Sequence, residues 1–186
     1  MSTIKDPTEL SGVFGESVSF RKIRGRVVAK NRPKRKMPPA SEDQIAIQKK
    51  FVKASKYAKA QMLDAERSAL YETGITLKKK NAFLVAISDA LNAPEVNEIR
   101  TTEYKGAVGN IIKIDAVDDF KVARVIATIT DNNGNELEQG EAVNDAKNPS
   151  VWRYTALVGN PGVKGSTISV TAFDHADNET TLEKVL

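Results

Sequence analysis

The chain has 186 residues and carries 28 Lys and Arg against 24 Asp and Glu, so its formal net charge is +4. The absence of cysteine excludes disulfides and cysteine-based zinc sites, and the single histidine excludes Ser-His-Asp triads and paired-histidine metal sites within one chain. No run reaches the roughly 18 apolar residues of a membrane span, and the polar N-terminus lacks the apolar segment of a secretory signal.

The charge is unevenly distributed along the chain. Residues 1–93 contain 19 Lys and Arg against 9 Asp and Glu, a balance of +10, whereas residues 94–186 contain 9 against 15, a balance of −6. A basic arm of this kind is typical of electrostatic docking on a negatively charged partner. We predict a partner-binding site at the nine positive charges of its densest run: Arg21, Lys22, Arg24, Arg26, Lys30, Arg32, Lys34, Arg35 and Lys36.

The first domain is predicted over residues 1–40 as a basic extended arm. Short β-prone runs at 17–20 and 26–29 predict a two-stranded ribbon, which is marginally stable in isolation. Three prolines (Pro33, Pro38 and Pro39) interrupt regular structure after the ribbon, so a basic linker is expected there.

The second domain is predicted over residues 41–93 as a helical hairpin. Ser41 and Gln44 form a capping-box signature, and a helix is expected to run from there to about Thr73. A second helix is expected at 78–91. The first helix carries one apolar stripe opposite a lysine-rich side, which predicts close packing on another element: Ile47, Phe51, Ala54, Ala58, Met62, Ala65 and Ala69.

The third domain is predicted over residues 94–186 as an all-β sandwich, which makes the chain α+β overall. The apolar period changes there from 3.6 to 2, as in Ile112/Ile114 and Trp152/Tyr154. Turn-forming residues separate about seven such runs, three of them weak, near Ile99, Leu137 and Leu182. This spacing predicts a sandwich of immunoglobulin-like size.

The second half resembles bacterial and phage immunoglobulin-like domains. The residues that carry the resemblance are Asp131 to Asn135, Gly140-Glu141-Ala142, Trp152-Arg153-Tyr154 and Val170 to Asp174. The resemblance covers about half the chain and implies the fold. It says little about function, because such sandwiches serve adhesins, enzyme accessories and virion proteins alike.

The whole arrangement is similar to auxiliary capsid proteins of crAss-like bacteriophages. The first half carries this similarity through a glycine-containing opening, a basic ribbon and a glutamine-rich helix entry: Gly12, Gly15, Arg24, Gly25, Arg26, Gln44, Gln48 and Phe51. The resemblance implies a structural virion protein that is assembled in the host cytoplasm. Its partners would be the major capsid protein and other virion subunits, met in many copies.

Few residues are candidates for catalysis or metal binding. We interpret His175 as an exposed loop residue, and the pairs Asp118/Asp119 and Asp174/Asp177 as turn-forming carboxylates. The segment from Asp131 to Glu136 superficially matches a calcium loop, but a hairpin turn fits it better, since the bidentate glutamate of that loop is missing. Trp152 is predicted as the core anchor of the sandwich.

The sequence therefore favours a non-enzymatic virion protein without cofactor, metal or membrane anchor. Its basic half is expected to dock on the capsid shell, and its sandwich to be displayed on the shell or to cement it. Two alternatives stay open: a nucleic-acid-associated protein whose arm follows phosphates, and a surface adhesin or carbohydrate-binding module. Scarce aromatic residues in the arm weigh against base recognition.

Overall fold

A computed structural model describes residues 12–14, 18–31 and 39–186. The chain divides into two compact units, Met1–Gln44 and Ile45–Leu186, each of which is described by itself. Among the described residues, no helix has the length and apolar character needed to cross a lipid bilayer.

The first unit contains a small antiparallel sheet with the order β1-β2-β3. Its strands are β1 (Gly12–Phe14), β2 (Val18–Ile23) and β3 (Arg26–Asn31). Arg24 and Gly25 connect β2 to β3 with φ angles of 49° and 80°. Two successive left-handed residues are the signature of a type I′ hairpin turn, whose twist matches that of the strands. The chain thus forms a hairpin where the sequence predicts a ribbon, with β1 as an additional strand.

Helix α1 (Glu42–Gln61) begins with the predicted capping box. The backbone N–H of Gln44 donates to Oγ of Ser41 at 3.3 Å, and the backbone N–H of Ser41 donates to Oε1 of Gln44 at 3.1 Å. The predicted end near Thr73 is wrong, because Asp64 starts a new helix, α2 (Ala65–Glu72). The Asp64 carboxylate accepts the N–H groups of Glu66 and Arg67, which satisfies the first turn of α2.

Helix α3 (Ala82–Leu91) begins four residues later than predicted. Asn81 is its N-cap, and Oδ1 of Asn81 accepts the N–H of Leu84 at 2.9 Å. The described residues therefore hold three helices instead of a two-helix hairpin. Their buried cluster consists of small side chains around one tyrosine: Ala54, Ala58, Tyr71, Ala82, Val85, Ala86 and Ile87.

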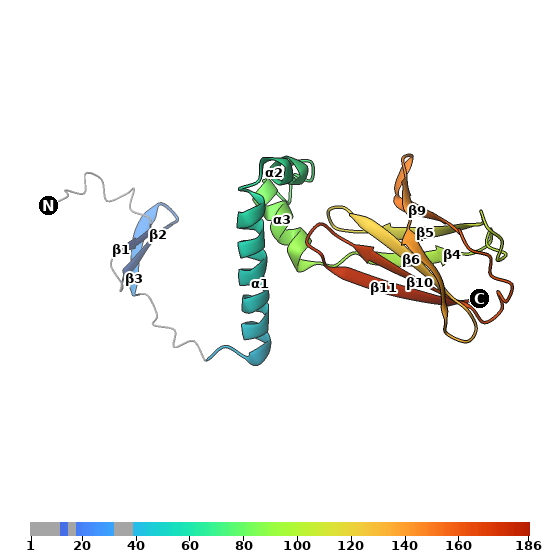
Figure 1. Ribbon diagram of the computed structural model, residues 1–186. Helices are drawn as coiled ribbons and strands as arrows, with labels where there is room; N and C mark the ends of the chain where they lie inside the picture. Colours follow the sequence, from blue (N-terminus) through green and yellow to red (C-terminus); the bar gives the residue numbers. More distant parts are fainter. Residues whose placement is uncertain (1–11, 15–17, 32–38) are drawn as a thin grey trace. The chain divides into compact units, whose positions relative to one another are not determined.

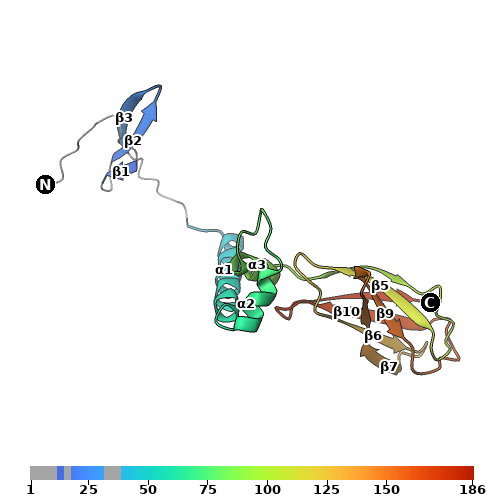
Figure 2. The same cartoon turned by 90° about the horizontal axis from the view of Figure 1, so that it is seen from above.

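Residues 95–185 form two four-stranded antiparallel sheets that pack as a sandwich (Figures 1 and 2). The sheet orders are β11-β10-β6-β7 and β4-β5-β9-β8. The three weak runs near Ile99, Leu137 and Leu182 are confirmed as strands, and one short strand, β8, was not predicted. The strands are β4 (Glu95–Arg100), β5 (Ile111–Val117), β6 (Arg124–Thr130), β7 (Glu136–Glu141), β8 (Val143–Asp145), β9 (Asn148–Thr155), β10 (Thr167–Phe173) and β11 (Glu179–Val185).

The sandwich core consists of the alternating inward positions of both sheets. Strand β5 contributes Ile112 and Ile114, and β10 contributes Ile168 and Val170, all of them buried. Trp152 lies in the same cluster with 7% of its surface exposed, so its predicted role as a core residue is confirmed. Burying one large aliphatic side chain stabilises the fold by roughly 1.5–3 kcal/mol.

The loop that precedes β5 requires glycine at position 106. Gly106 has a φ of +83°, and a Cβ atom there would lie 2.2 Å from the carbonyl oxygen of Asn160 and 2.5 Å from Cγ2 of Val163. Gly109 has a similar φ of +86°, but no atom of the described part of the chain lies within 4 Å of its Cβ position. The two glycines therefore separate the cost of backbone strain from the cost of a steric clash.

We expect Gly106→Ala to lower the free energy of unfolding by about 2–4 kcal/mol, because it adds overpacking to left-handed strain. Gly109→Ala, the matched control, should cost only about 1–2 kcal/mol, the strain alone. Urea unfolding followed by Trp152 fluorescence measures both values. Equal losses in the two variants would contradict the close approach of Gly106 to Asn160.

Candidate docking interface and helix–sandwich junction

One face of the β2–β3 hairpin is both basic and apolar. Successive side chains of a strand point to opposite faces, and directly paired residues share a face. The pairs Arg21↔Val28, Ser19↔Lys30 and Ile23↔Arg26 therefore lie on one face. All but Ser19 are exposed, including Ile23 at 54% and Val28 at 41%. We call Arg21, Ile23, Arg26, Val28 and Lys30 the basic face.

Five of the nine predicted site residues belong to the hairpin, and four do not. Besides the three cations of the basic face, Lys22 lies on the opposite face and Arg24 in the turn, and both are exposed. The other four lie outside the described residues: Arg32, Lys34, Arg35 and Lys36.

Strand β3 forms one edge of the three-stranded sheet. Within residues 12–14, 18–31 and 39–186, no strand pairs with its outer side. An open edge offers unpaired N–H and C=O groups to another chain, and lysine and arginine on such an edge oppose pairing with a copy of itself. The hairpin therefore combines an open strand edge with a positively charged face.

Within the second unit, the apolar side chains in the first half of α1 are exposed to solvent. Ile47 and Phe51 are 68% and 51% exposed, although they continue the stripe of Ala54 and Ala58, which are buried. The sequence predicts that the whole stripe packs on another element, and in this unit only its second half does. Lys49 and Lys53 are also exposed, on the opposite side of the helix. A partner that covers this stripe would therefore have to offer an apolar surface.

The helices are joined to the sandwich by a chain of short hydrogen-bond contacts. The hydroxyl of Tyr57 lies 2.6 Å from the carbonyl oxygen of His175 and 2.7 Å from the hydroxyl of Tyr71. The Tyr71 hydroxyl in turn lies 2.7 Å from Oδ2 of Asp89. Asp89 and Tyr71 are fully buried, and burial raises the pKa values of both tyrosines.

Burial favours the neutral form of Asp89. The Tyr71 hydroxyl donates to Oδ2 of Asp89, and the Tyr57 hydroxyl donates to the carbonyl oxygen of His175. The hydrogen bond from Tyr71 by itself lowers the pKa of Asp89, but burial outweighs it. Burial, with smaller contributions from the charges of Asp174, Asp118 and Asp119, raises the pKa of Asp89 to about 7.

Two further side chains fix the same junction. The Asn178 amide donates to the backbone carbonyl of Asp89 at 3.0 Å and to Oδ2 of Asp174 at 2.7 Å. Oδ2 of Asp119 accepts from Lys79 at 2.9 Å, from Asn92 at 3.0 Å and from the hydroxyl of Ser88. Burial alone would raise the pKa of Asp119, but the hydrogen bonds from Ser88 and Lys79 outweigh it and lower that pKa.

The sequence predicts that His175 is an exposed loop residue. The residue does lie in a loop, but it is not exposed. It is partly buried at this junction, its ring lies 5.8 Å from that of Phe120, and burial lowers its pKa. Phe120 also contacts Tyr71, with ring centroids 5.0 Å apart. The sequence does not predict the cluster, because Tyr57, Asp89 and His175 are up to 118 residues apart along the chain.

Asp118 and Asp174 form turns, as predicted, whereas the carboxylate of Asp119 binds Lys79, Ser88 and Asn92 instead. Oδ2 of Asp118 accepts the N–H groups of Phe120 and Lys121, and Oδ1 of Asp174 accepts those of Ala176 and Asn178. Oδ1 of Asp131 likewise accepts the N–H groups of two residues in the β6–β7 hairpin turn, Asn133 and Asn135.

Neither a model of a known protein family nor a curated protein sequence gives a match to this chain.

Protonation of Asp89 makes the stability of the second unit depend on pH. The ordinary pKa of 3.8 applies to the unfolded chain, so between pH 4 and about 7 the folded protein holds a proton that the unfolded chain has released. The stabilisation is complete below pH 4 and is lost as the pH rises through about 7. We expect the free energy of unfolding to fall by up to about 1.4 kcal/mol per pH unit in this window.

Asp89→Asn isolates this contribution, because the asparagine side chain stays neutral at every pH. The variant should match the wild type at pH 4, exceed it in stability at pH 8, and lack the slope between these values. Urea denaturation at each pH measures this. Identical pH profiles for the wild type and Asp89→Asn would contradict the uptake of a proton by Asp89 on folding.

Proposed function

We propose that this protein is a non-enzymatic structural component of a bacteriophage virion. Its basic N-terminal half docks on the shell of the major capsid protein, and its sandwich is displayed on the shell or cements neighbouring subunits. The observation that carries the proposal is the basic face of the hairpin, in which three exposed cations surround two exposed aliphatic side chains on a strand with an open edge.

Charge supports a protein surface as the docking partner. The +10 balance of residues 1–93 steers the chain toward an acidic surface and raises the rate of encounter. Ile23 and Val28 then bury apolar area in the complex, and the open edge of β3 allows a strand of the partner to extend the sheet. Many copies on one shell add their individually weak contacts.

The side chains of the hairpin favour protein over nucleic acid as this partner. Proteins that bind single strands stack bases on exposed aromatic residues. In the described hairpin, residues 18–31, the one aromatic residue is Phe20, and it is partly buried on the face opposite to the basic face. The exposed apolar residues beside the cations are aliphatic, which suits a protein surface.

The strand order supports an immunoglobulin-like assignment of the sandwich. In that fold, strands A, B, E and D form one sheet and strands C, F and G form the other. If β4, β5 and β6 are A, B and C, β7 is an inserted strand and β8 to β11 are D to G, the sheets reproduce this arrangement. The core tryptophan differs, since Trp152 lies on β9 instead of on the third strand. Such domains display loops at both ends, as a surface module requires.

Reversing the charges of the basic face tests the proposal. We expect Arg21→Glu, Arg26→Glu and Lys30→Glu together to weaken binding to empty capsid shells by at least about tenfold at low salt, and less at high salt, because salt screens the attraction. Co-sedimentation with DNA-free shells measures the affinity. A gel shift with bulk DNA at the same salt concentration shows whether the arm binds phosphates instead.

The matched control carries the same change in charge on loops of the sandwich. Lys105, Lys147 and Lys164 are exposed, and none of their side chains makes a hydrogen bond or an ion pair with the described residues. The control triple variant to Glu should bind shells like the wild type. Wild-type binding to DNA alone, or equal losses in both triple variants, would refute docking through the basic face.

The bare half of α1 gives a second test. We expect Ile47→Ser with Phe51→Ser to change the free energy of unfolding by less than about 1 kcal/mol, because both side chains are exposed. The same variant should reduce shell binding if this stripe contacts the capsid. Val108→Ser with Val143→Ser, which changes exposed residues of the sandwich, is the control and should leave both quantities unchanged. A loss of stability instead of binding would place the stripe in the fold and remove it from the docking surface.

A further inference from the structure

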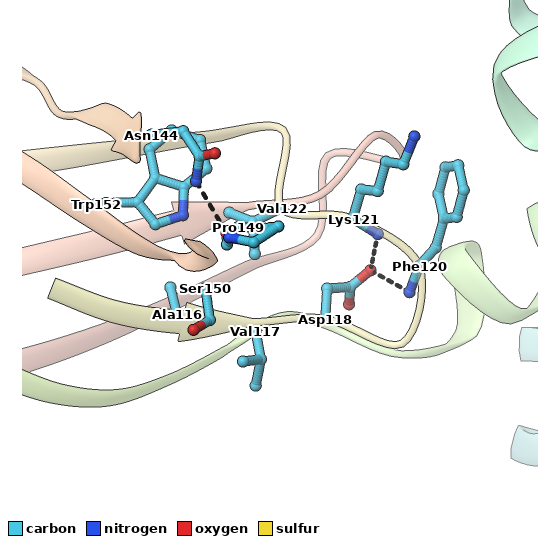
Figure 3. A pocket seen from close by; sticks show the side chains of 10 residues that line it. All are labelled: Ala116, Val117, Asp118, Phe120, Lys121, Val122, Asn144, Pro149, Ser150 and Trp152. Atoms are coloured by element: carbon cyan, nitrogen blue, oxygen red, sulfur yellow. Dashed lines mark hydrogen bonds between the residues drawn. The ribbon is translucent and has the colours of Figure 1, made fainter. Parts of the chain in front are cut away.

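A pocket opens at the end of the sandwich beside the β5–β6 loop (Figure 3). Its volume is about 390 Å³, which lies in the range of small-molecule sites, roughly 300–1,000 Å³. Its walls come from the end of β5, the β5–β6 loop, β8 and the start of β9. The pocket is independent of the basic hairpin, so it is separate from the docking function proposed above.

Two polar groups of pocket-lining residues have no hydrogen-bond partner within residues 12–14, 18–31 and 39–186. They are Nε1 of Trp152 and Oδ1 of Asp118, and both atoms are buried. Figure 3 shows the two side chains on its wall, with Oδ2 of Asp118 turned to the N–H groups of Phe120 and Lys121. A buried polar group without a partner destabilises a fold by about 1–3 kcal/mol. A ligand that reaches both groups from the pocket would supply their missing partners.

The two groups define what that ligand must offer. The indole N–H of Trp152 only donates, and an ionised Asp118 only accepts. A simple cation would satisfy Asp118 but not Trp152, and a simple anion would do the reverse. A hydroxyl group both donates and accepts, so a ligand with neighbouring hydroxyls satisfies both residues.

The rest of the lining fits a neutral ligand with apolar C–H faces. Val117, Val122 and Pro149 line the pocket with aliphatic surface, and Asn144 and Ser150 add polar groups. Lys121, a cation of the lining, donates from Nζ to the hydroxyl of Thr73 at 2.8 Å.

We propose that this pocket binds a neutral sugar residue, with Asp118 accepting a hydrogen bond from one ligand hydroxyl and Trp152 donating a hydrogen bond to a neighbouring hydroxyl. The aliphatic walls pack on the C–H groups of the ring. The pocket lies on the sandwich, which the proposed function places on the outside of the shell. Sugar binding in this pocket does not depend on docking.

Trp152 is the only tryptophan in the chain, so its indole N–H gives one unambiguous NMR signal. The full chain is titrated to tens of millimolar with methyl glycosides of glucose, galactose, mannose, fucose and N-acetylglucosamine. We expect at least one sugar to shift this signal in a saturable way. N-methylacetamide, which carries the donor and acceptor of a peptide bond, is titrated in parallel.

Asp118→Asn is the decisive variant. Its carbonyl oxygen can still accept the N–H groups of Phe120 and Lys121, while its NH₂ group replaces the acceptor on the pocket side. We expect sugar affinity to fall about tenfold or more. Asp131→Asn, which alters another turn-forming carboxylate, should leave the affinity unchanged.

Each other outcome overturns the proposal. No saturable shift with any of the sugars means that the pocket is not a sugar site. Unchanged affinity in Asp118→Asn means that sugars bind elsewhere. A stronger response to N-methylacetamide than to every sugar means that the pocket receives a polypeptide segment.

Discussion

The arrangement of the second unit depends on how Tyr71 is held. Its ring packs on Phe120 of the β5–β6 loop, and its hydroxyl stands between Tyr57 of α1 and Asp89 of α3. One side chain thus contacts two other helices and a loop of the sandwich. Gly74 allows this, because a Cβ atom there would lie 2.6 Å from the Phe120 ring. The helices have a core of mostly small residues and gain much of their order from this junction.

The junction also limits which parts of the chain remain available to partners. Ala54 and Ala58 are covered where α1 meets the other helices, whereas Ile47 and Phe51 lie one to two turns earlier and stay bare. A helix that is anchored at one end and free at the other presents an apolar stripe without losing its own fold. The hairpin is stabilised differently, since the pairing of its two strands and a type I′ turn hold it together. The two elements differ in their charge: in the hairpin the exposed aliphatic side chains lie beside cations, whereas in α1 the apolar stripe lies opposite Lys49 and Lys53.

Local patterns in the sequence predict the elements well and their contacts poorly. The capping box at Ser41 and Gln44 and the alternation in β5 and β10 are local, so the sequence predicts the start of α1 and the sandwich strands. The break at Asp64 is also local but ambiguous, because aspartate tolerates a helix interior nearly as well as many residues. The Tyr57–Tyr71–Asp89 chain and the unpaired groups of the pocket join distant residues, and no periodicity marks them. The partial burial of His175 has the same origin, since Phe120 and Tyr57 reach it from other parts of the chain.

Two buried carboxyl groups of this unit show how the same residue type takes different roles. Asp89 accepts a hydrogen bond from Tyr71, and burial favours its neutral form. Asp118 uses one oxygen to close a turn, and its other oxygen has no hydrogen-bond partner among the described residues. Burial raises the pKa of both carboxyl groups. In the proposed sugar site, a ligand hydroxyl donates to this second oxygen of Asp118, and a neighbouring hydroxyl accepts from Trp152.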